Sequence, residues 1–305
     1  MSKFLVTGGM GFIGSNLVDK LISQGHSVVV MDNQSTDVHD NFYINHYADN
    51  HVLDINDYQS VLECSYGVDG IFHLAAEARI QPAIKNPTLA TKTNVLGTCN
   101  ILQAARENSV KRVVFSSSSS VYGLTESLPN RETDDTNCLN PYSVSKFSGE
   151  GLCKMYYDLF GLETITFRYF NVYGERQPTK GQYAPVIGLF QKQLENNEPM
   201  TIVGDGFQRR DFTHVSDVVN ANILAMTTQN EKSFGQVLNI GSGVNFNIHD
   251  LVKMVGGDMA KYVYIPERVG ESRETLCDNT KAKDCIGWAP KVSLSEWIRE
   301  KNNFI

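Results

Sequence analysis

A tyrosine and a lysine four residues apart, Tyr142 and Lys146, form the pattern Y-x-x-x-K. On a helix, this spacing places both side chains on one face. A free tyrosine has a pKa of about 10 and is a poor base near neutral pH, but a neighbouring ammonium favours the phenolate and lowers that pKa. The pair can therefore supply a general base that takes a proton from a hydroxyl group. Because the pattern also occurs by chance on solvated helices, it indicates this chemistry only together with other features.

A run of five serines, Ser116 to Ser120, follows a short apolar strand pattern and precedes Val121-Tyr122-Gly123. In an open α/β sheet, the carboxyl ends of the strands line the ligand crevice. A serine hydroxyl at that edge can hydrogen-bond a substrate oxygen and relay its proton. The alternative is a polar loop that caps a helix.

The turn from Thr7 to Gly14 is rich in glycine and contains both G-x-G-x-x-G and G-x-x-G-x-x-G. A strand pattern precedes it and a helix pattern follows, the setting in which a backbone approaches a pyrophosphate at a helix N-terminus. About 18 residues further on, Asp32 ends a second strand pattern, where a carboxylate accepts hydrogen bonds from an adenosine ribose. No Arg or Lys stands beside Asp32, which favours NAD over NADP because the carboxylate would repel a 2′-phosphate.

The elements that carry these motifs alternate between strand and helix along the first half of the chain. Apolar runs predict strands over 3–6, 27–31, 69–74, 112–115 and 163–168, and amphipathic runs predict helices over 12–23, 87–108 and 141–160. This alternation indicates an α/β fold with a doubly wound parallel sheet, a Rossmann fold. After about residue 171 the elements shorten, as expected for a smaller C-terminal substrate-binding region. Residues 1–171 would form the NAD-binding domain, with 212–240 packing back on it; 172–211 and 241–305 would bind the substrate.

The composition excludes several classes of function. The 305 residues carry a net charge of −7, which argues against nucleic-acid binding. No apolar run approaches the roughly 20 residues that cross a bilayer, and a strand pattern that begins at Lys3 leaves no room for a signal peptide. The six cysteines match no zinc template, so we expect a cytoplasmic protein with reduced thiols and no metal. His73, at a strand end, is expected to be structural.

Together these motifs resemble the extended short-chain dehydrogenase/reductase superfamily, specifically its NAD-dependent nucleotide-sugar epimerases and dehydratases. Within that branch the chain is most similar to UDP-hexose and UDP-N-acetylhexosamine 4-epimerases. The matching segments follow one another nearly end to end: Thr7 to Gly14, Asp32-Asn33, Asp54-Ile55, His73 to Ala76, Asn94, Ser116 to Gly123, Pro141-Tyr142 with Lys146, Arg168 to Asn171, Arg210 to Phe212, and Arg268 with Gly270-Glu271.

The resemblance implies a role for each matching residue. Tyr142 would be the base, Lys146 would hold the nicotinamide ribose, and Ser118, three positions before Val121, would be the catalytic hydroxyl, with Ser117 and Ser119 as neighbouring candidates. Besides Tyr142 and Lys146, NAD would be bound by Gly8, Gly11, Phe12, Ile13, Gly14, Asp32, Asn33, Asp54, Ile55, Leu74, Ala75, Ala76, Asn94, Ser116 and Tyr169. The nucleotide sugar would be bound by Ser118, Asn171, Tyr183, Ala184, Val186, Ile187, Arg210, Arg268, Glu271 and Thr275.

The implied reaction is C4 epimerisation of a nucleotide sugar through a transient 4-keto sugar, an isomerase activity of carbohydrate metabolism. The family's dehydratases carry Asp-Glu, or at least Glu, where this chain has Ser119 and Ser120, and its decarboxylases carry Glu at the second position; serine cannot serve as their acid or base. Both remain alternatives, as does a dinucleotide-sensing module without activity.

The sequence indicates the substrate less specifically than it indicates the reaction. Thr275 stands where the 4-epimerases have a size gate, and a small residue there admits N-acetylated sugars. We therefore expect UDP-GlcNAc/UDP-GalNAc or UDP-glucose/UDP-galactose, with UDP-glucuronate as the alternative. Members of the family usually dimerise through two helices of each subunit. The corresponding helices here are 87–108 and 141–160, so the resemblance implies a homodimer.

Overall fold

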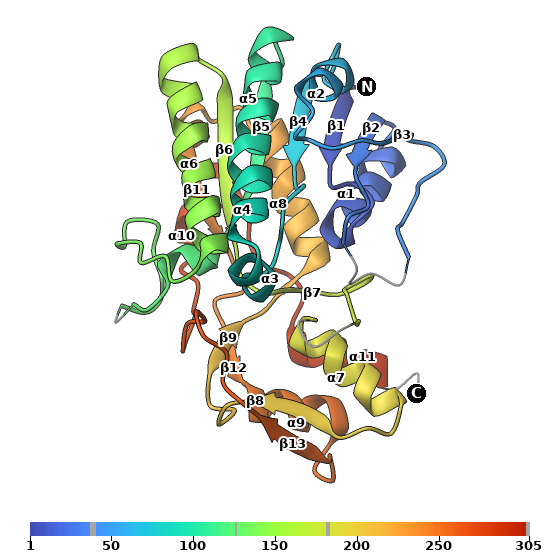
Figure 1. The fold of residues 1–305 in the computed structure, drawn as a ribbon, viewed down its shortest axis with the longest axis vertical. Helices are drawn as coiled ribbons and strands as arrows, with labels where there is room; N and C mark the ends of the chain where they lie inside the picture. Colours follow the sequence, from blue (N-terminus) through green and yellow to red (C-terminus); the bar gives the residue numbers. More distant parts are fainter. Residues whose placement is uncertain (37–40, 126, 181–183, 303–305) are drawn as a thin grey trace.

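The computed structural model describes residues 1–36, 41–125, 127–180 and 184–302 (Figure 1). Its largest part is a seven-stranded parallel sheet in the order β11-β6-β5-β4-β1-β2-β3. The chain runs outward from β1 to β3, then crosses back to β4 and continues in the opposite direction. The order therefore reverses between β1 and β4, where doubly wound sheets place their ligands. The strands are β1 (Lys3–Thr7), β2 (Ser27–Asp32), β3 (Asp49–Val52), β4 (Gly70–His73), β5 (Arg112–Ser118), β6 (Glu163–Tyr169) and β11 (Gln236–Ile240).

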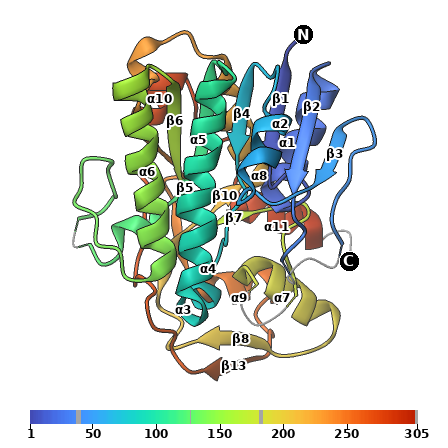
Figure 2. The same ribbon diagram turned by 45° about the horizontal axis from the view of Figure 1, so that its top comes forward.

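Helices cover both faces of the sheet, as the unbroken apolar strands require. Alternate residues of β1 show the division: Phe4 and Val6 pack on α1 (Phe12–Ser23), α8 (Val215–Thr227) and α10 (Thr280–Ile286), whereas Leu5 faces the other core. That second core lies under α2 (Tyr58–Cys64), α5 (Gly97–Glu107) and α6 (Pro141–Phe160). Figure 2 shows α5 and α6 side by side on this face.

A smaller region lies at the carboxyl ends of the strands (Figure 1). It has its own apolar core, which includes Phe190, Ile202 and Leu251. Its elements are α7 (Val186–Glu195), α9 (Ile248–Gly256) and α11 (Leu294–Asn302), with the strand pairs β7 (Val172–Tyr173) and β10 (Thr213–His214), β9 (Arg209–Asp211) and β12 (Asn245–Asn247), and β8 (Met200–Val203) and β13 (Tyr262–Ile265). Short 3-10 turns span Ser119–Tyr122 and Glu231–Ser233.

The predicted helices occur at the predicted places. The helices over 12–23 and 141–160 have the predicted ends. The helix over 87–108 is a succession of α4 (Pro87–Thr91), a π-helical turn (Lys92–Leu96) and α5, and the short α3 (Ile80–Lys85) precedes it. Several elements of the large domain were not predicted, among them β3, α2, α3 and β11. In β3 the sequence Asp-Asn-His-Val has no apolar run, because this edge strand is largely solvent-facing.

Candidate active site

A cleft of about 650 Å³ lies between the carboxyl ends of the sheet and the smaller region. It is within the range of small-molecule sites. The turn between β1 and α1 lines one end of it, the ends of β5 and α6 line its middle, and residues of the smaller region line the other end.

The glycine turn is built so that α1 begins against the end of the sheet. A Cβ on Gly14 would lie 2.1 Å from the carbonyl oxygen of Gly8, and a Cβ on Gly8, whose φ is +68°, would lie 2.8 Å from the amide nitrogen of Ala75. The N-cap of α1 is Gly11, whose lack of a side chain leaves the helix N-terminus open toward a ligand. Asp32 is fixed at the end of β2, where its carboxylate accepts hydrogen bonds from the amides of Met10 (3.0 Å) and Gln34 (2.8 Å). This arrangement fits a pyrophosphate at the helix N-terminus and a ribose at the carboxylate.

Tyr142 and Lys146 reach the middle of the cleft from the first turns of α6. The start of this helix is fixed by a capping box between Asn140 and Ser143, with Pro141 in the first turn. The Ser118 side chain lies close enough to the Tyr142 phenol to oppose the rise of its pKa, and the buried Lys146 Nζ donates to the Ser116 carbonyl oxygen at 2.7 Å. The structure therefore places Ser118 next to the tyrosine.

The neighbouring serines are engaged differently. The Ser117 hydroxyl donates to Glu150 Oε1 at 2.5 Å and is therefore engaged by a buried carboxylate. Ser119 lies in the short 3-10 turn that follows β5. Ser118 is therefore the candidate that the geometry favours.

The electrostatics of the pair differ from the sequence-based expectation. Burial raises the pKa of Tyr142, and only the hydrogen bond from Ser118 opposes this shift. Burial also lowers the pKa of Lys146 to about 7, opposed by Cys153 and Glu150. The prediction that Lys146 lowers the pKa of Tyr142 is wrong, because desolvation of the phenolate dominates and the Lys146 ammonium donates to the Ser116 carbonyl instead.

Most of the predicted cofactor residues line the cleft. These are Gly8, Gly11, Phe12, Ile13, Gly14, Asp32, Asn33, Ile55, Leu74, Ala75, Ala76, Ser116, Tyr142, Lys146 and Tyr169. Asp54 and Asn94 are not among the lining residues. The Asp54 carboxylate accepts a hydrogen bond from Asn33 Nδ2 (3.2 Å). It therefore supports the side chain of Asn33, which does line the cleft. Asn94 is buried, pairs with the backbone of Glu77 in both directions and donates to Ser145 (2.9 Å), so it supports the wall of the cleft.

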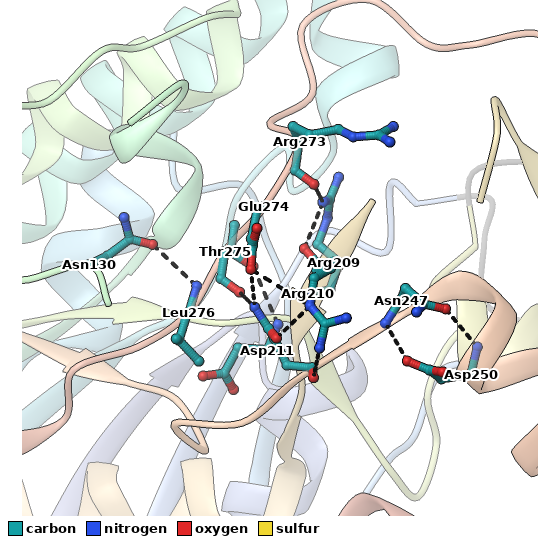
Figure 3. A network of polar contacts seen from close by, with 11 residues as sticks. Asn130, Arg209, Arg210, Asp211, Asn247, Asp250, Arg273, Glu274, Thr275 and Leu276 are labelled. Carbon is teal, nitrogen blue, oxygen red and sulfur yellow. Dashed lines mark hydrogen bonds and ion pairs between the residues drawn. The ribbon is translucent and has the colours of Figure 1, made fainter. Parts of the chain in front are cut away.

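The predicted substrate residues gather at the other end. Ser118, Asn171, Ala184, Val186, Ile187, Arg210, Arg268, Glu271 and Thr275 line the cleft, whereas Tyr183 lies outside the described residues. Glu271 stands 3.9 Å from both Arg210 and Arg268. The guanidinium of Arg210 donates to the carbonyls of Arg209 (3.0 Å) and Arg273 (3.1 Å) (Figure 3). Two arginines with a single carboxylate between them suit a diphosphate.

Several lining residues were not predicted. Glu77, Arg79 and Gln81 form the wall that leads into α3, and Gln208 and Ser272 lie near the two arginines. Each of them stands within a few positions of a recognised motif, and that proximity was the available signal. His73 is structural, as predicted: it is buried between the hydroxyls of Thr7 (2.8 Å) and Thr98 (3.0 Å), and burial lowers its pKa to about 3.

The described part of the chain contains neither a metal-binding cluster nor a membrane-spanning helix. No group of His, Cys, Asp and Glu side chains there could hold a metal ion. None of the helices described is both long and apolar enough to cross a membrane.

A Rossmann sheet, a glycine turn with an acidic partner, and a Ser–Tyr–Lys group at the same sheet edge define an NAD-dependent enzyme of the short-chain dehydrogenase/reductase class. Residues 5–301 match the family model described as GDP-mannose 4,6 dehydratase. The chain belongs to this family of nucleotide-sugar enzymes.

Several of its relatives are named as 4-epimerases, and others as decarboxylases. The UDP-glucose 4-epimerase of Mycolicibacterium smegmatis is 35% identical over 99% of this chain and 98% of its own length. The UDP-glucose 4-epimerase of Thermotoga maritima, solved with UDP-glucose, has a TM-score of 0.91 at 34% identity and covers 99% of this chain and 100% of its own. The UDP-N-acetylglucosamine 4-epimerase of Methanobrevibacter ruminantium has a TM-score of 0.90 at 31% identity, covering 99% and 97%.

One similar structure was solved with both a nucleotide sugar and NAD. The UDP-glucuronic acid 4-epimerase of Bacillus cereus, solved with UDP-glucuronic acid and NAD, has a TM-score of 0.87 at 30% identity and covers 99% of this chain and 98% of its own. These relationships confirm the predicted fold class, the enzyme class and the NAD cofactor.

Proposed function

We propose that the protein interconverts two UDP-sugars that differ in configuration at C4. The observation that carries this proposal is the contact between the Tyr142 phenol and the Ser118 hydroxyl, in a cleft that also holds Arg210 and Arg268 at its substrate end. Residues 1–171 with 212–240 would bind the dinucleotide, and 172–211 with 241–305 the nucleotide sugar.

The cofactor supplies reversible hydride exchange at C4 when it is bound. Asp32 and the turn around Gly11 would hold its adenosine diphosphate, and Lys146 its nicotinamide ribose. Tyr142 takes the proton of the C4 hydroxyl, with Ser118 bound to the same oxygen, and returns that proton after the 4-keto sugar has turned over in the cleft. Because burial raises the pKa of Tyr142, the positive charge of a bound oxidised cofactor would favour its deprotonation.

The turn beside Ser118 favours epimerisation over elimination. Ser119 and Ser120 line the cleft next to Ser118 and present only hydroxyl groups. A dehydratase or decarboxylase needs an acid or a base there, and a serine hydroxyl does not titrate in the required range. The sugar should therefore leave the site with its mass unchanged.

Thr275 supports acceptance of an N-acetylated sugar. It lines the cleft and is the small residue expected at a size gate. UDP-GlcNAc/UDP-GalNAc and UDP-glucose/UDP-galactose are thus the proposed substrates, which agrees with the names of the relatives from M. ruminantium and T. maritima. The likeness to the B. cereus enzyme keeps UDP-glucuronate as the second candidate.

The test is to incubate the purified protein with each UDP-sugar and to follow the product by NMR and mass spectrometry. We expect the C4 epimer of UDP-GlcNAc or UDP-glucose at constant mass. Loss of water or of carbon dioxide would contradict the reaction. Turnover of UDP-glucuronate, with the other two sugars left intact, would contradict the choice of substrate.

We also propose a cytoplasmic homodimer. The face formed by α4, the π-helical turn, α5 and α6 (Figure 2) exposes apolar side chains: Leu89, Leu96, Val144, Phe147 and Leu159 are between 42% and 69% exposed. An apolar face of this kind is typical of a subunit interface. Light scattering should report a dimer that Phe147→Glu converts to a monomer, whereas Phe207→Glu, at an exposed aromatic residue of the smaller region, should leave it intact.

A further inference from the structure

Asp211, the last residue of β9, is fully buried behind the substrate end of the cleft. Its Oδ1 accepts hydrogen bonds from the amide and the hydroxyl of Ser242 (2.8 and 2.7 Å), and its Oδ2 accepts from the amides of Gly243 (2.9 Å) and Cys277 (3.0 Å). The carboxylate therefore ties together three segments that are far apart in the sequence: β9, the loop after β11, and the stretch that follows Thr275.

The backbone of Asp211 holds two of the residues that line the cleft. Its carbonyl oxygen accepts from Asn171 Nδ2 at 2.9 Å, and its amide donates to the Thr275 hydroxyl at 3.3 Å. Arg210 precedes it directly and also lines the cleft. Figure 3 shows Asp211 between Arg210 and Thr275, with the dashed contact to Thr275. One residue thus sets the relative positions of a candidate diphosphate ligand and the candidate sugar gate.

We propose that Asp211 is a positioning residue whose carboxylate fixes the spacing between Arg210 and Thr275, and so sets both the affinity for the nucleotide sugar and the choice between sugars. This inference rests on the proposed function, because it assigns Arg210 to the diphosphate and Thr275 to the sugar.

An asparagine cannot replace this carboxylate. Each of its two oxygens accepts from two donors, so an amide NH₂ in either orientation would face a pair of donors. Three of these donors are backbone amides of the connected segments, and their bonds to a charged acceptor are stronger than bonds to a neutral one. Loss of the tie should move residues 275–277 away from β9, and with them the wall of the sugar site.

The experiment compares wild type, Asp211→Asn, Ser242→Ala and the control Asp258→Asn, in which the same change is made at an exposed carboxylate. Ser242→Ala removes one donor and keeps all three amides. For each protein, kcat and KM are measured with UDP-glucose and UDP-GlcNAc, and bound NAD is measured by absorbance. We expect KM to rise about tenfold in Asp211→Asn and about threefold in Ser242→Ala, while bound NAD stays at the wild-type level.

A second readout separates positioning from general stability. Displacement of Thr275 should change the ratio of kcat/KM between UDP-GlcNAc and UDP-glucose in Asp211→Asn, which a lower melting temperature alone would not do. An Asp211→Asn enzyme that retains NAD with unchanged KM values and an unchanged ratio would overturn the inference. If that variant does not fold, Ser242→Ala decides: an unchanged KM overturns the inference and a raised KM supports it. A wild-type protein that turns over neither sugar would overturn the proposed function and this inference together.

Discussion

The fold is destabilised by the charge of Lys146, and this cost can be measured. The side chain is 3% exposed, and its ammonium has the Ser116 carbonyl as a hydrogen-bond acceptor. Burial lowers the pKa of Lys146 from 10.5 to about 7. At about 1.4 kcal/mol for each pKa unit, this corresponds to about 5 kcal/mol against the charged folded form.

The sign of the pH dependence follows from the direction of the shift. Below pH 7, Lys146 is protonated in both the folded and the unfolded protein, so the full cost is present. Between about pH 7 and 10.5 the folded protein has released the proton while the unfolded chain still binds it, so the free energy of unfolding rises with pH. Near pH 10.5 the contribution of this group has disappeared.

Replacing Lys146 by Met should therefore stabilise the cofactor-free protein at pH 6.5 while abolishing its activity. The variant removes the buried charge and leaves the Ser116 carbonyl without its donor, a loss of about 1–3 kcal/mol. The net gain is about 2–4 kcal/mol, or about 5 °C in Tm for a chain of this length. At pH 9.5 the gain should fall to about zero, because most of the cost in the wild type has by then been relieved.

Thermal unfolding of cofactor-stripped wild type and Lys146→Met, followed by circular dichroism at pH 6.5 and 9.5, tests this reasoning. Lys253→Met provides the matched control, since the Lys253 side chain is 73% exposed and should give no pH-dependent difference. A Lys146→Met protein that melts at or below the wild-type temperature at pH 6.5 would refute the argument. So would a difference from wild type that is the same at both pH values.

Three further substitutions test other parts of the site. Tyr142→Phe keeps the ring and removes the hydroxyl, so kcat should fall about 10³-fold with NAD still bound; coupled assays and cofactor absorbance report both, and retained turnover would exclude Tyr142 as the base. Thr275→Tyr should abolish turnover of UDP-GlcNAc in NMR assays and preserve that of UDP-glucose; equal loss of both would argue against a size gate. Gly14→Ala should prevent retention of NAD during purification, because its Cβ would lie 2.1 Å from the Gly8 carbonyl oxygen. Gly151→Ala is its control, since a Cβ there meets nothing within 4 Å. A Gly14→Ala protein that retains NAD would show that the backbone of the turn can shift to accommodate a methyl group.

The sequence was most informative where local interactions determine structure. The ends of α6 are an example: Asn140 caps the helix, Pro141 begins it, and Gly161 ends it with a left-handed φ of 70°. Each of these residues acts on its immediate neighbours, so its type and position predict the helix directly. The glycine turn before α1 was predictable for the same reason.

Contacts between distant segments were not predictable from local patterns. The strand β11 joins the large sheet beside β6, with Gln236 opposite Ile165, although it lies beyond several elements of the smaller region. The carboxylate of Asp211 reaches Ser242 and Cys277, neither of which has a neighbour that indicates such a partner. A single sequence shows that an aspartate follows Arg210, but not that three backbone amides surround its side chain.

The sequence alone does not show which serine of the run Ser116 to Ser120 acts beside Tyr142, but the buried contacts of these serines do. Five identical side chains carry no local signal of which one faces Tyr142. The Ser117 hydroxyl donates to Glu150, whose carboxylate is itself paired with Arg168 at 2.7 Å. Release of Ser117 for another role would break a buried hydrogen bond to a charged group, which is worth about 1.5–3 kcal/mol. The ion pair between Glu150 and Arg168 therefore removes Ser117 from the candidates, and among the remaining hydroxyls the effect of Ser118 on the Tyr142 phenol favours Ser118.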